Sequence, residues 1–273
     1  MEKELLRKVQ LTQLEIAKEI RRVCEENDIC YFLADGSFLG AVRHQGFIPW
    51  DDDLDIGMLR EDYEKFFRIA PEKLKPEYCV QSWYTDSNYG LPFGKVMKRN
   101  TVYLEGKKTN RLKENGFYVD VFPFDYVPEG EEERKALAGR LLKIYRIILM
   151  KCGYRPWMEN GKVLWKKRLG YLYYQLLSLG KQQAQLVREY DALARSAPKS
   201  SVICEQSALA KPDYYRAELF ETMAEYPFEG EQFCCVKDYD GYLGALYGDY
   251  MKLPPEDQRE NRHQIIEVDF GQE

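Results

Sequence analysis

The spacing of apolar residues changes twice along this chain, and this change restricts the fold more than any other feature. Residues 3–26 carry apolar side chains at three- and four-residue steps with charges between them, which is typical of an amphipathic helix. The helical spacing returns over residues 131–195, with breaks near Gly153–Pro156 and at Gly161. Between these helical parts lie short runs rich in β-formers, at 29–34, 53–58, 78–83, 93–99 and 118–122. This order predicts an α+β fold, with a small mixed sheet flanked by helices, and not a doubly wound one.

Shorter signals refine this plan. Residues 37–43 and 60–69 have helical character, and we expect Pro71 and Pro76 to end the second of these helices. Asp35-Gly36 after the first β-run predicts a tight turn. At 273 residues the chain suits one large domain or two small ones. We divide it into a core (1–130), a basic helical block (131–199) and a mixed segment that packs on the core (200–273).

Charge is distributed unevenly. The chain has 45 acidic and 40 basic residues, a net charge of −5, which disfavours a nucleic acid as partner. Residues 134–188, however, contain thirteen bases and one acid, so this segment carries +12 and the remainder −17. A basic helical block with apolar faces and several tryptophans and tyrosines suits contact with an anionic membrane or a phosphate-bearing acceptor. The alternative is an ordinary solvated face of packed helices.

The remaining composition narrows the class of protein. The seven cysteines form no C-x-x-C pair, which argues against a zinc ribbon or a disulfide framework and favours a reducing compartment. The first residues lack the apolar region of a signal peptide, and no apolar run is long enough to span a bilayer. We therefore predict a cytoplasmic protein, with peripheral attachment to the inner face of the membrane as an extension of that prediction.

An acidic cluster at residues 51–55 is the most informative functional signal. On a strand, Asp53 and Asp55 would project from one face while Leu54 and Ile56 turn to the core. Two carboxylates this close repel each other, so both stay ionised only with a cation between them. Mg²⁺, with Mn²⁺ as a substitute, is the hard cation that oxygen ligands of this kind prefer.

Two further motifs belong with this cluster. Gly36 and Ser37 follow a β-run and offer backbone N–H groups and a hydroxyl that can bind a phosphate. Asp120 lies in the β-like run 117–123 and would join Asp53 and Asp55 if their strands are neighbours. A carboxylate there can also accept the proton of an attacking hydroxyl.

Three other interpretations of the aspartates at residues 51–55 are a solvated loop, a calcium site and a glycosyltransferase motif. A solvated loop is disfavoured because apolar residues stand on both sides of the run. A calcium-binding EF-hand is excluded, because Ile56 replaces the required glycine and Asp62 the required glutamate. A nucleotide-sugar glycosyltransferase also uses an Asp-x-Asp pair, so that alternative stays open.

Residues 32–57, with Ala34-Asp35-Gly36-Ser37 and Trp50-Asp51-Asp52-Asp53-Leu54-Asp55, resemble the signature of the LicD family. This family includes bacterial phosphocholine transferases and is related to fukutin and fukutin-related protein. The resemblance continues in the same order at 93–96, 120–123, 242–243, 246–251 and 254–255. It implies a nucleotidyltransferase-like fold, with residues 1–130 as its catalytic core.

The resemblance also implies a reaction. A phospho-alcohol, most simply phosphocholine, passes from a CDP-alcohol donor to a hydroxyl of a cell-surface glycan or of its lipid-linked precursor, and CMP leaves. Lipopolysaccharide and teichoic acid are acceptors of this type. Asp53 and Asp55 would bind the metal, and Asp120 would complete its shell and accept the proton. Gly36 and Ser37 would bind a donor phosphate.

Further roles are expected for cations and aromatic rings. Arg43 and Lys95 are candidates to offset charge on the leaving CMP, although each could be an ordinary surface base. A choline head group would pack on aromatic faces, and the aromatic residues nearest the motifs are Trp50, Trp83, Tyr84, Tyr89 and Tyr118. Two alternatives remain: nucleotide transfer from an NTP to a small acceptor, and a non-catalytic glycan- or membrane-binding protein on the same fold.

Overall fold

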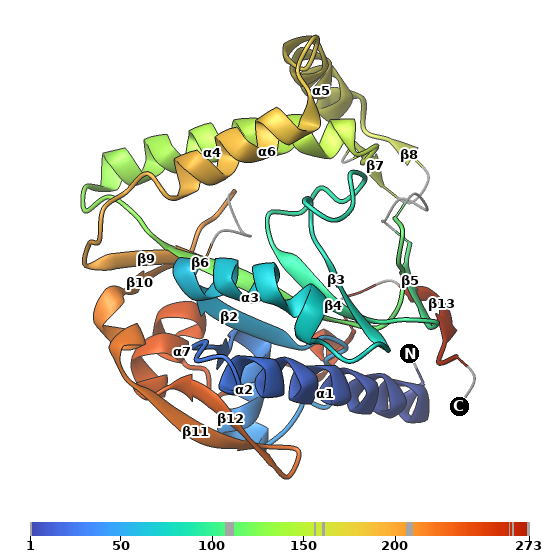
Figure 1. Cartoon of the computed structure of the whole chain (residues 1–273), viewed down its shortest axis with the longest axis vertical. Helices are drawn as coiled ribbons and strands as arrows, with labels where there is room; N and C mark the ends of the chain where they lie inside the picture. The colour runs from blue at the N-terminus through green and yellow to red at the C-terminus, as the bar shows by residue number, and fades with distance from the viewer. Residues whose placement is uncertain are drawn as a thin grey trace.

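A mixed seven-stranded sheet forms the centre of the computed structural model (Figure 1). The model describes residues 2–106, 112–155, 157–159, 162–205, 210–261, 263 and 265–271. The strand order is β1-β2-β6-β4-β3, and β9 with β10 extends the sheet from the far end of β6. The β2–β6 pair is parallel and the other pairs are antiparallel. The strands of this sheet are β1 (Phe32–Leu33), β2 (Asp55–Leu59), β3 (Tyr78–Gln81), β4 (Gly94–Lys98), β6 (Tyr118–Tyr126), β9 (Val202–Glu205) and β10 (Tyr214–Arg216).

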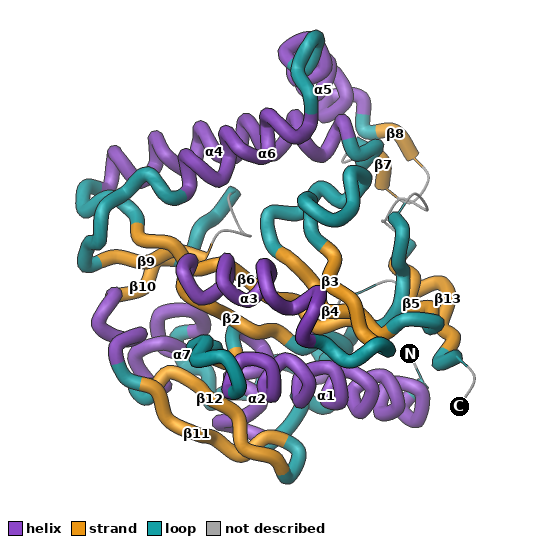
Figure 2. The backbone as a smooth tube through the Cα atoms, viewed as in Figure 1, coloured by secondary structure: helices purple, strands orange, loops and turns teal. Residues whose placement is uncertain are grey.

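Three short two-stranded sheets and seven α-helices complete the described fold (Figure 2). The small sheets pair β5 (Val102–Glu105) with β13 (Ile265–Asp269), β7 (Met158–Glu159) with β8 (Lys162–Val163), and β11 (Met223–Phe228) with β12 (Glu231–Val236). The helices are α1 (Lys3–Glu25), α2 (Asp35–His44), α3 (Arg60–Lys73), α4 (Glu131–Lys151), α5 (Trp165–Leu177), α6 (Gln183–Ala194) and α7 (Tyr239–Tyr247). Two 3₁₀ turns lie at Ala217–Glu221 and Glu256–Gln258.

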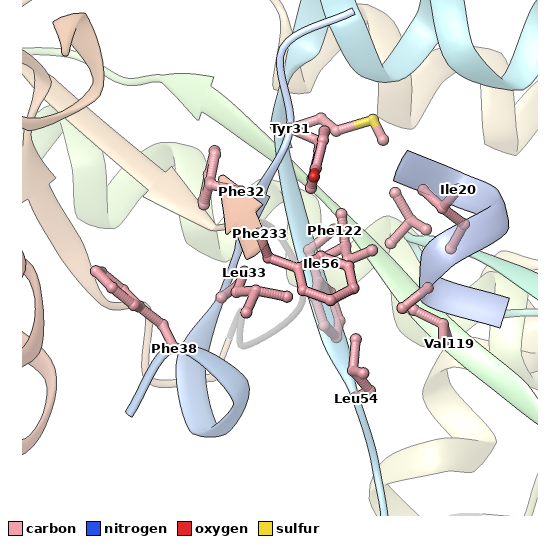
Figure 3. Close-up of a cluster of buried hydrophobic side chains, with 14 of the residues drawn as sticks. Ile20, Tyr31, Phe32, Leu33, Phe38, Leu54, Ile56, Val119, Phe122 and Phe233 are labelled. Carbon is pink, nitrogen blue, oxygen red and sulfur yellow. The ribbon is translucent and has the colours of Figure 1, made fainter. Parts of the chain in front are cut away.

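The main core lies between the sheet and the N-terminal helices. Helix α1 packs on β4 and β6, and α3 packs on β2, β3 and β6. Figure 3 shows Ile20 of α1 beside Val119 of β6, with Ile56 of β2 next to them. All three side chains are fully buried. Because side chains alternate across a strand, burying Ile56 and Val119 on this face turns Asp55 and Asp120 to the opposite face.

The helical block builds a second apolar cluster. Helices α4 and α6 pack side by side and bury Leu141, Ile148 and Tyr190. Helix α5 packs on α4 and extends beyond both helices at one end of the molecule (Figure 1). Within the described parts of the chain, no helix has both the length and the apolar run that crossing a bilayer requires.

Most of the expected elements are confirmed. The helix predicted over 3–26 is α1, and the helical interpretation of 131–195 is confirmed by α4, α5 and α6. Helix α4 ends at Lys151, beside Gly153, whose φ is +84°. Pro156 and Gly161, the other predicted break points, lie outside the described residues. The α+β class is therefore confirmed, while the division at 130 and 199 stays a prediction.

Three local predictions are wrong. Pro71 does not end α3, because it lies in the last turn, where its missing N–H removes a single backbone hydrogen bond. The helix ends at Lys73, with Leu74 as its C-cap, shortly before Pro76, the other predicted end. No separate turn occurs at Asp35-Gly36, since Asp35 already opens α2. Strand β2 begins at Asp55, so Asp53 precedes the strand and does not share its face by alternation.

Candidate functional site

The parallel register of β2 and β6 brings together two carboxylates that are 65 positions apart in sequence. Asp55 is the direct partner of Asp120 in this register, and the Asp120 N–H donates to the Leu54 carbonyl at 3.1 Å. The strand of Asp120 is thus the neighbour of the strand of Asp55, as the sequence predicted conditionally. Burial and the repulsion of Asp53, Asp35 and Asp120 raise the pKa of Asp55 well above its usual range.

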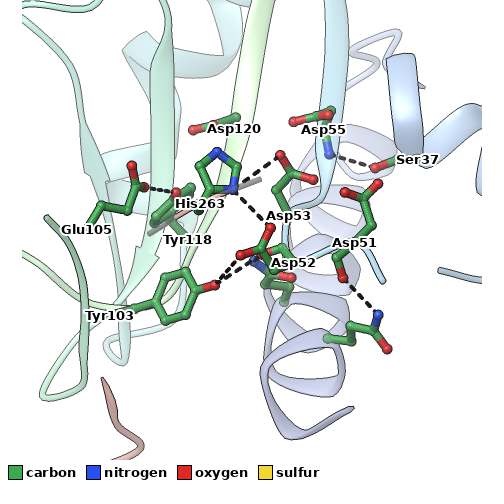
Figure 4. A network of polar contacts seen from close by, with 12 residues as sticks. Ser37, Asp51, Asp52, Asp53, Asp55, Tyr103, Glu105, Tyr118, Asp120 and His263 are labelled. Carbon is green, nitrogen blue, oxygen red and sulfur yellow. Dashed lines mark hydrogen bonds and ion pairs between the residues drawn. The ribbon is translucent and has the colours of Figure 1, made fainter. Parts of the chain in front are cut away.

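Asp53 lies in the irregular segment that leads into β2. Burial, together with the charges of Asp52 and Asp120, raises the pKa of Asp53. Figure 4 shows its carboxylate on the same side of the segment as Asp55 and Asp120. The three predicted carboxylates therefore interact electrostatically, although only two of them lie on strands.

A cavity of about 580 Å³ opens beside these carboxylates. Asp53 and Asp55 line it, whereas Asp120 does not. Much of the remaining wall comes from α2 and from the end of α7 with the segment after it, and Arg43 joins these two parts by donating from Nη1 to the Tyr250 carbonyl at 2.7 Å. This C-terminal part of the wall includes residues that the sequence matched to the family without a role: Leu246, Tyr247, Asp249, Tyr250, Pro254 and Pro255.

Three acidic residues of the cavity were missed from the sequence. Asp35, Glu205 and Asp213 line it together with Asp53 and Asp55. Burial and the charges of Glu205 and Asp213 raise the pKa of Asp35 well above its usual range. Asp35 also has φ +45°, an uncommon conformation for a residue other than glycine. The position of Asp35 directly before Gly36-Ser37 was a sequence signal that could have identified it. The sequences around Glu205 and Asp213 gave no indication that these residues line the cavity.

The neighbouring aspartates Asp51 and Asp52 divide between the cavity and the protein interior. Asp51, Asp52 and Asp53 each offer one oxygen within 4.8 Å of the others, which is close enough to share a cation. Asp51 lines the cavity, and a Cβ on Gly36 would come within 2.9 Å of its Oδ2. Glycine at 36 therefore allows this aspartate to approach the first turn of α2. Asp52, which is fully buried, points instead toward Tyr103 and His263 (Figure 4).

His263 is a site residue that sequence spacing could not reveal. Its Nδ1 lies 3.0 Å from Asp52 Oδ1 and 3.8 Å from Asp53 Oδ2. The hydrogen bond to Asp52 and the charge of Asp53 raise the pKa of His263 to about 9. The raised pKa favours the protonated ring, in which Nδ1–H donates to Asp52 while Asp53 lies within ion-pair distance. More than 200 positions separate the histidine from its partners, so only the fold brings them together.

Lys95 lies opposite Asp120 in the β4–β6 register and forms an ion pair with it. Its side chain is 3% exposed, and its ammonium group lies 3.3 Å from the centroid of the Tyr118 ring. Lys95 is thus part of the acidic site and not a surface base. Its predicted contact with a leaving phosphate stays a prediction.

This ion pair gives a testable expectation for Lys95→Met. The substitution leaves Asp120 without its cation and should lower the free energy of unfolding by about 2–3 kcal/mol in metal-free buffer. Mg²⁺ should recover part of this loss, because the site becomes more negative. Urea unfolding with and without Mg²⁺ measures both effects. Lys98→Met on the same strand is the matched control, and an equal loss there would contradict the assignment.

The predicted phosphate-binding residues Gly36 and Ser37 lie in the first turn of α2. Ser37 Oγ accepts a hydrogen bond from the Asp55 N–H at 2.8 Å, so it ties α2 to the start of β2 (Figure 4). Gly36 lines the cavity, as does Arg43. Arg43 Nε donates to His44 Nε2 at 3.0 Å, and burial beside this arginine lowers the pKa of His44. Ser37 is buried and does not line the cavity, so of the four predicted donor-binding residues only Gly36 and Arg43 do, and all these roles stay predictions.

The aromatic candidates separate into two groups. Trp50 lines the cavity, where Tyr247 and Tyr250 join it. Trp83 packs on Tyr190 in the second apolar cluster, with ring centroids 5.0 Å apart. The other candidates are also occupied elsewhere: Tyr84 Oη pairs with Asp191, Tyr89 is buried and Tyr118 lies against Lys95.

The donor set of this site fits a hard divalent cation. Asp53 and Asp55 present oxygen atoms, which Mg²⁺ and Mn²⁺ prefer over nitrogen or sulfur. Like charges and burial raise the pKa values of both carboxyls, and a bound cation would offset that repulsion. An acidic cavity on a mixed sheet whose adjacent strands carry Asp55 and Asp120 agrees with the nucleotidyltransferase-like fold that the resemblance implies.

Comparison with known proteins identifies the family. The family described as LicD/FKTN/FKRP, nucleotidyltransferase domain, matches residues 28–141. The lipopolysaccharide cholinephosphotransferase LicD of Haemophilus influenzae is 30% identical over 267 residues, which cover 96% of this chain and 97% of that protein. Ribitol 5-phosphate transferase FKRP of mouse and human is 46% identical over 48 residues, 18% of this chain and 10% of each relative. The chain therefore belongs to the LicD family and is a transferase.

Proposed function

We propose that this chain transfers phosphocholine from CDP-choline to a hydroxyl of a cell-surface glycan or its lipid-linked precursor and releases CMP. The observation that carries the proposal is the acidic cavity lined by Asp53 and Asp55, with Asp120 paired to Asp55 on the adjacent strand. The full-length similarity to a lipopolysaccharide cholinephosphotransferase supports phosphocholine as the group and a glycan as the acceptor.

In this proposal the acidic residues position the donor. Asp53 and Asp55 would bind Mg²⁺, and a bound divalent cation supplies neutralisation of the donor diphosphate. Gly36 lines the cavity in the first turn of α2 and would bind a donor phosphate there, as the N-termini of helices favour anions. The Arg43 guanidinium lies at the same cavity and would offset charge on the CMP leaving group.

The transfer itself requires one proton acceptor. The acceptor hydroxyl oxygen forms a bond to the phosphorus that carries choline, and the bond from that phosphorus to the bridging oxygen breaks. CMP leaves with the electron pair, and the hydroxyl proton passes to Asp120. Lys95 forms an ion pair with this carboxylate from the neighbouring strand β4. In this proposal Asp120 and Lys95 act together as an ion pair between β6 and β4.

A donor panel tests the proposal. With purified protein, Mg²⁺ and a glycan acceptor, we expect CMP release from CDP-choline at a rate at least about tenfold above that from CDP-ethanolamine, CDP-ribitol or CDP-glycerol. CDP-ribitol is the most informative competitor, because FKRP is named a ribitol 5-phosphate transferase. A preference for CDP-ribitol would show that the transferred group is ribitol phosphate and not phosphocholine, while the proposed type of reaction would stand.

The same assay separates the other reaction classes. Pyrophosphate release from an NTP, without CMP release from any CDP-alcohol, would indicate nucleotide transfer instead. Heat protection by a donor without turnover under any condition would indicate a binding protein. Chelation of the metal with EDTA should abolish CMP release, and restoring Mg²⁺ should recover it.

A further inference from the structure

Helix α5 presents a continuous apolar stripe to solvent. No residue of this helix is buried. Large apolar side chains recur on it at three- and four-residue steps, so they fall on one face of the helix. These residues are between 45% and 72% exposed: Trp165, Leu169, Leu172, Tyr173, Leu176 and, just beyond the helix, Leu179. Isolated exposed apolar residues are common, but an aligned stripe of this size marks a contact surface.

The opposite face of α5 fixes the direction of this stripe. Tyr171, Tyr174 and Leu177 are half-buried, and Arg146 of α4 donates to Tyr174 Oη at 2.8 Å. Helix α5 therefore packs on α4 through one face and turns the stripe away from the protein. Because α5 lies at one end of the molecule, nothing in the described fold covers the stripe (Figure 1).

Basic residues flank the stripe. At 100° per residue, Lys166 and Arg168 fall on its two sides, and both are exposed. The Arg168 guanidinium lies 4.9 Å from the centroid of the Trp165 ring, at the border of the stripe. The segment 134–188 carries +12, and Glu159 is its one acid. An apolar face between basic rims is the pattern of a helix that lies in the interface of an anionic bilayer.

A cavity of about 430 Å³ adjoins the same helix. Arg155 and Arg168 line it with Trp157 and Tyr171. Guanidinium groups bind phosphate oxygens, and aromatic rings are favoured at the depth of the lipid head groups. The cavity therefore offers a place for an anionic head group at the edge of the stripe.

We propose that α5 docks on an anionic lipid bilayer, with its apolar stripe in the head-group boundary and its bases against lipid phosphates. The charge argues against a second copy of this chain as the occupant, because two-fold packing would bring two segments of +12 together. This surface is independent of the proposed reaction. It would hold the enzyme beside acceptors that are attached to a membrane.

Vesicle sedimentation tests this surface. We expect the protein to sediment with phosphatidylcholine vesicles that contain roughly 30% phosphatidylglycerol, and to bind pure phosphatidylcholine vesicles at least about tenfold more weakly. Leu169→Gln with Leu176→Gln should weaken anionic binding by about tenfold or more, because the stripe loses two anchors. Lys166→Glu with Arg168→Glu should weaken anionic binding to a similar extent. Salt at about 0.5 M should also weaken the binding of the wild-type protein to anionic vesicles.

Matched controls come from α1. Leu11, which is 43% exposed, and Lys8, which is also exposed, allow Leu11→Gln and Lys8→Glu. Both controls should bind like the wild type, and all variants should keep the wild-type melting temperature, since every substituted side chain is exposed. Equal binding to neutral vesicles, or unchanged binding of both α5 variants, would overturn the proposal. It would also fall if sedimentation velocity showed a dimer that the leucine variant dissociates while vesicles stay unbound.

Discussion

Asp55→Asn should reduce CMP release by about 10²–10³-fold or more while the protein remains folded. The amide keeps the size of the side chain but loses the charge that the proposed metal site requires. Asp53→Asn should have an effect of similar size, because the two carboxyls line the cavity together. Initial rates with CDP-choline at saturating Mg²⁺ measure the loss.

Stability gives this prediction a second, independent readout. Burial and neighbouring carboxylates raise the pKa of Asp55 well above its usual range, so its ionised form costs free energy in the folded protein at neutral pH. Removing that charge should leave the metal-free melting temperature unchanged or raise it. The increase in melting temperature that Mg²⁺ gives the wild-type protein should disappear in the variant.

Asp28→Asn is the matched control for both readouts. Asp28 is exposed, and its φ of +50° suits asparagine as well as aspartate. This control should keep both its activity and its response to Mg²⁺. Wild-type activity in Asp55→Asn would refute the catalytic assignment, and a large drop in its melting temperature would show that Asp55 is structural instead.

The sequence brought the local residues of the site together but did not place all of them correctly. Gly36, Ser37, Asp53 and Asp55 lie within twenty residues, whereas the alternation around Leu54 does not apply to Asp53, because β2 begins only at Asp55. Asp120 needed one further assumption, that its strand neighbours that of Asp55, and the parallel register confirms it. Strong β-formers on both sides made this assumption reasonable.

The rest of the site depends on contacts between distant segments. Asp213 and His263 reach the acidic residues from the C-terminal third, and no local period or spacing indicates where a chain returns. The same holds for Lys95, whose burial follows from its position opposite Asp120 and not from its neighbours in sequence. Local patterns predict elements, whereas partners of a buried charge are set by the tertiary fold.

Outside the cavity, the buried ion pair between Arg60 and Asp125 is the polar contact that we expect to contribute most to the stability of the fold. Arg60, the first residue of α3, donates from Nε and Nη2 to the two carboxylate oxygens of Asp125 at 2.8 and 2.5 Å. The Asp125 side chain is 2% exposed, and the Arg60 side chain is 13% exposed. Two parallel hydrogen bonds of this kind fix the start of α3 against β6.

Removing one partner should therefore cost far more than removing both. Arg60→Met leaves a buried carboxylate without a cation and should lower the free energy of unfolding by about 3–5 kcal/mol, measured by urea denaturation. Arg60→Met with Asp125→Leu should recover most of this loss, because no unpaired charge remains. Glu64 of α3 and Arg195 form an exposed pair at 2.7 Å, and Arg195→Met should cost less than about 1 kcal/mol. Equal losses for Arg60→Met and Arg195→Met would show that burial does not strengthen the Arg60 pair, and the anchoring of α3 would then rest on its apolar contacts alone.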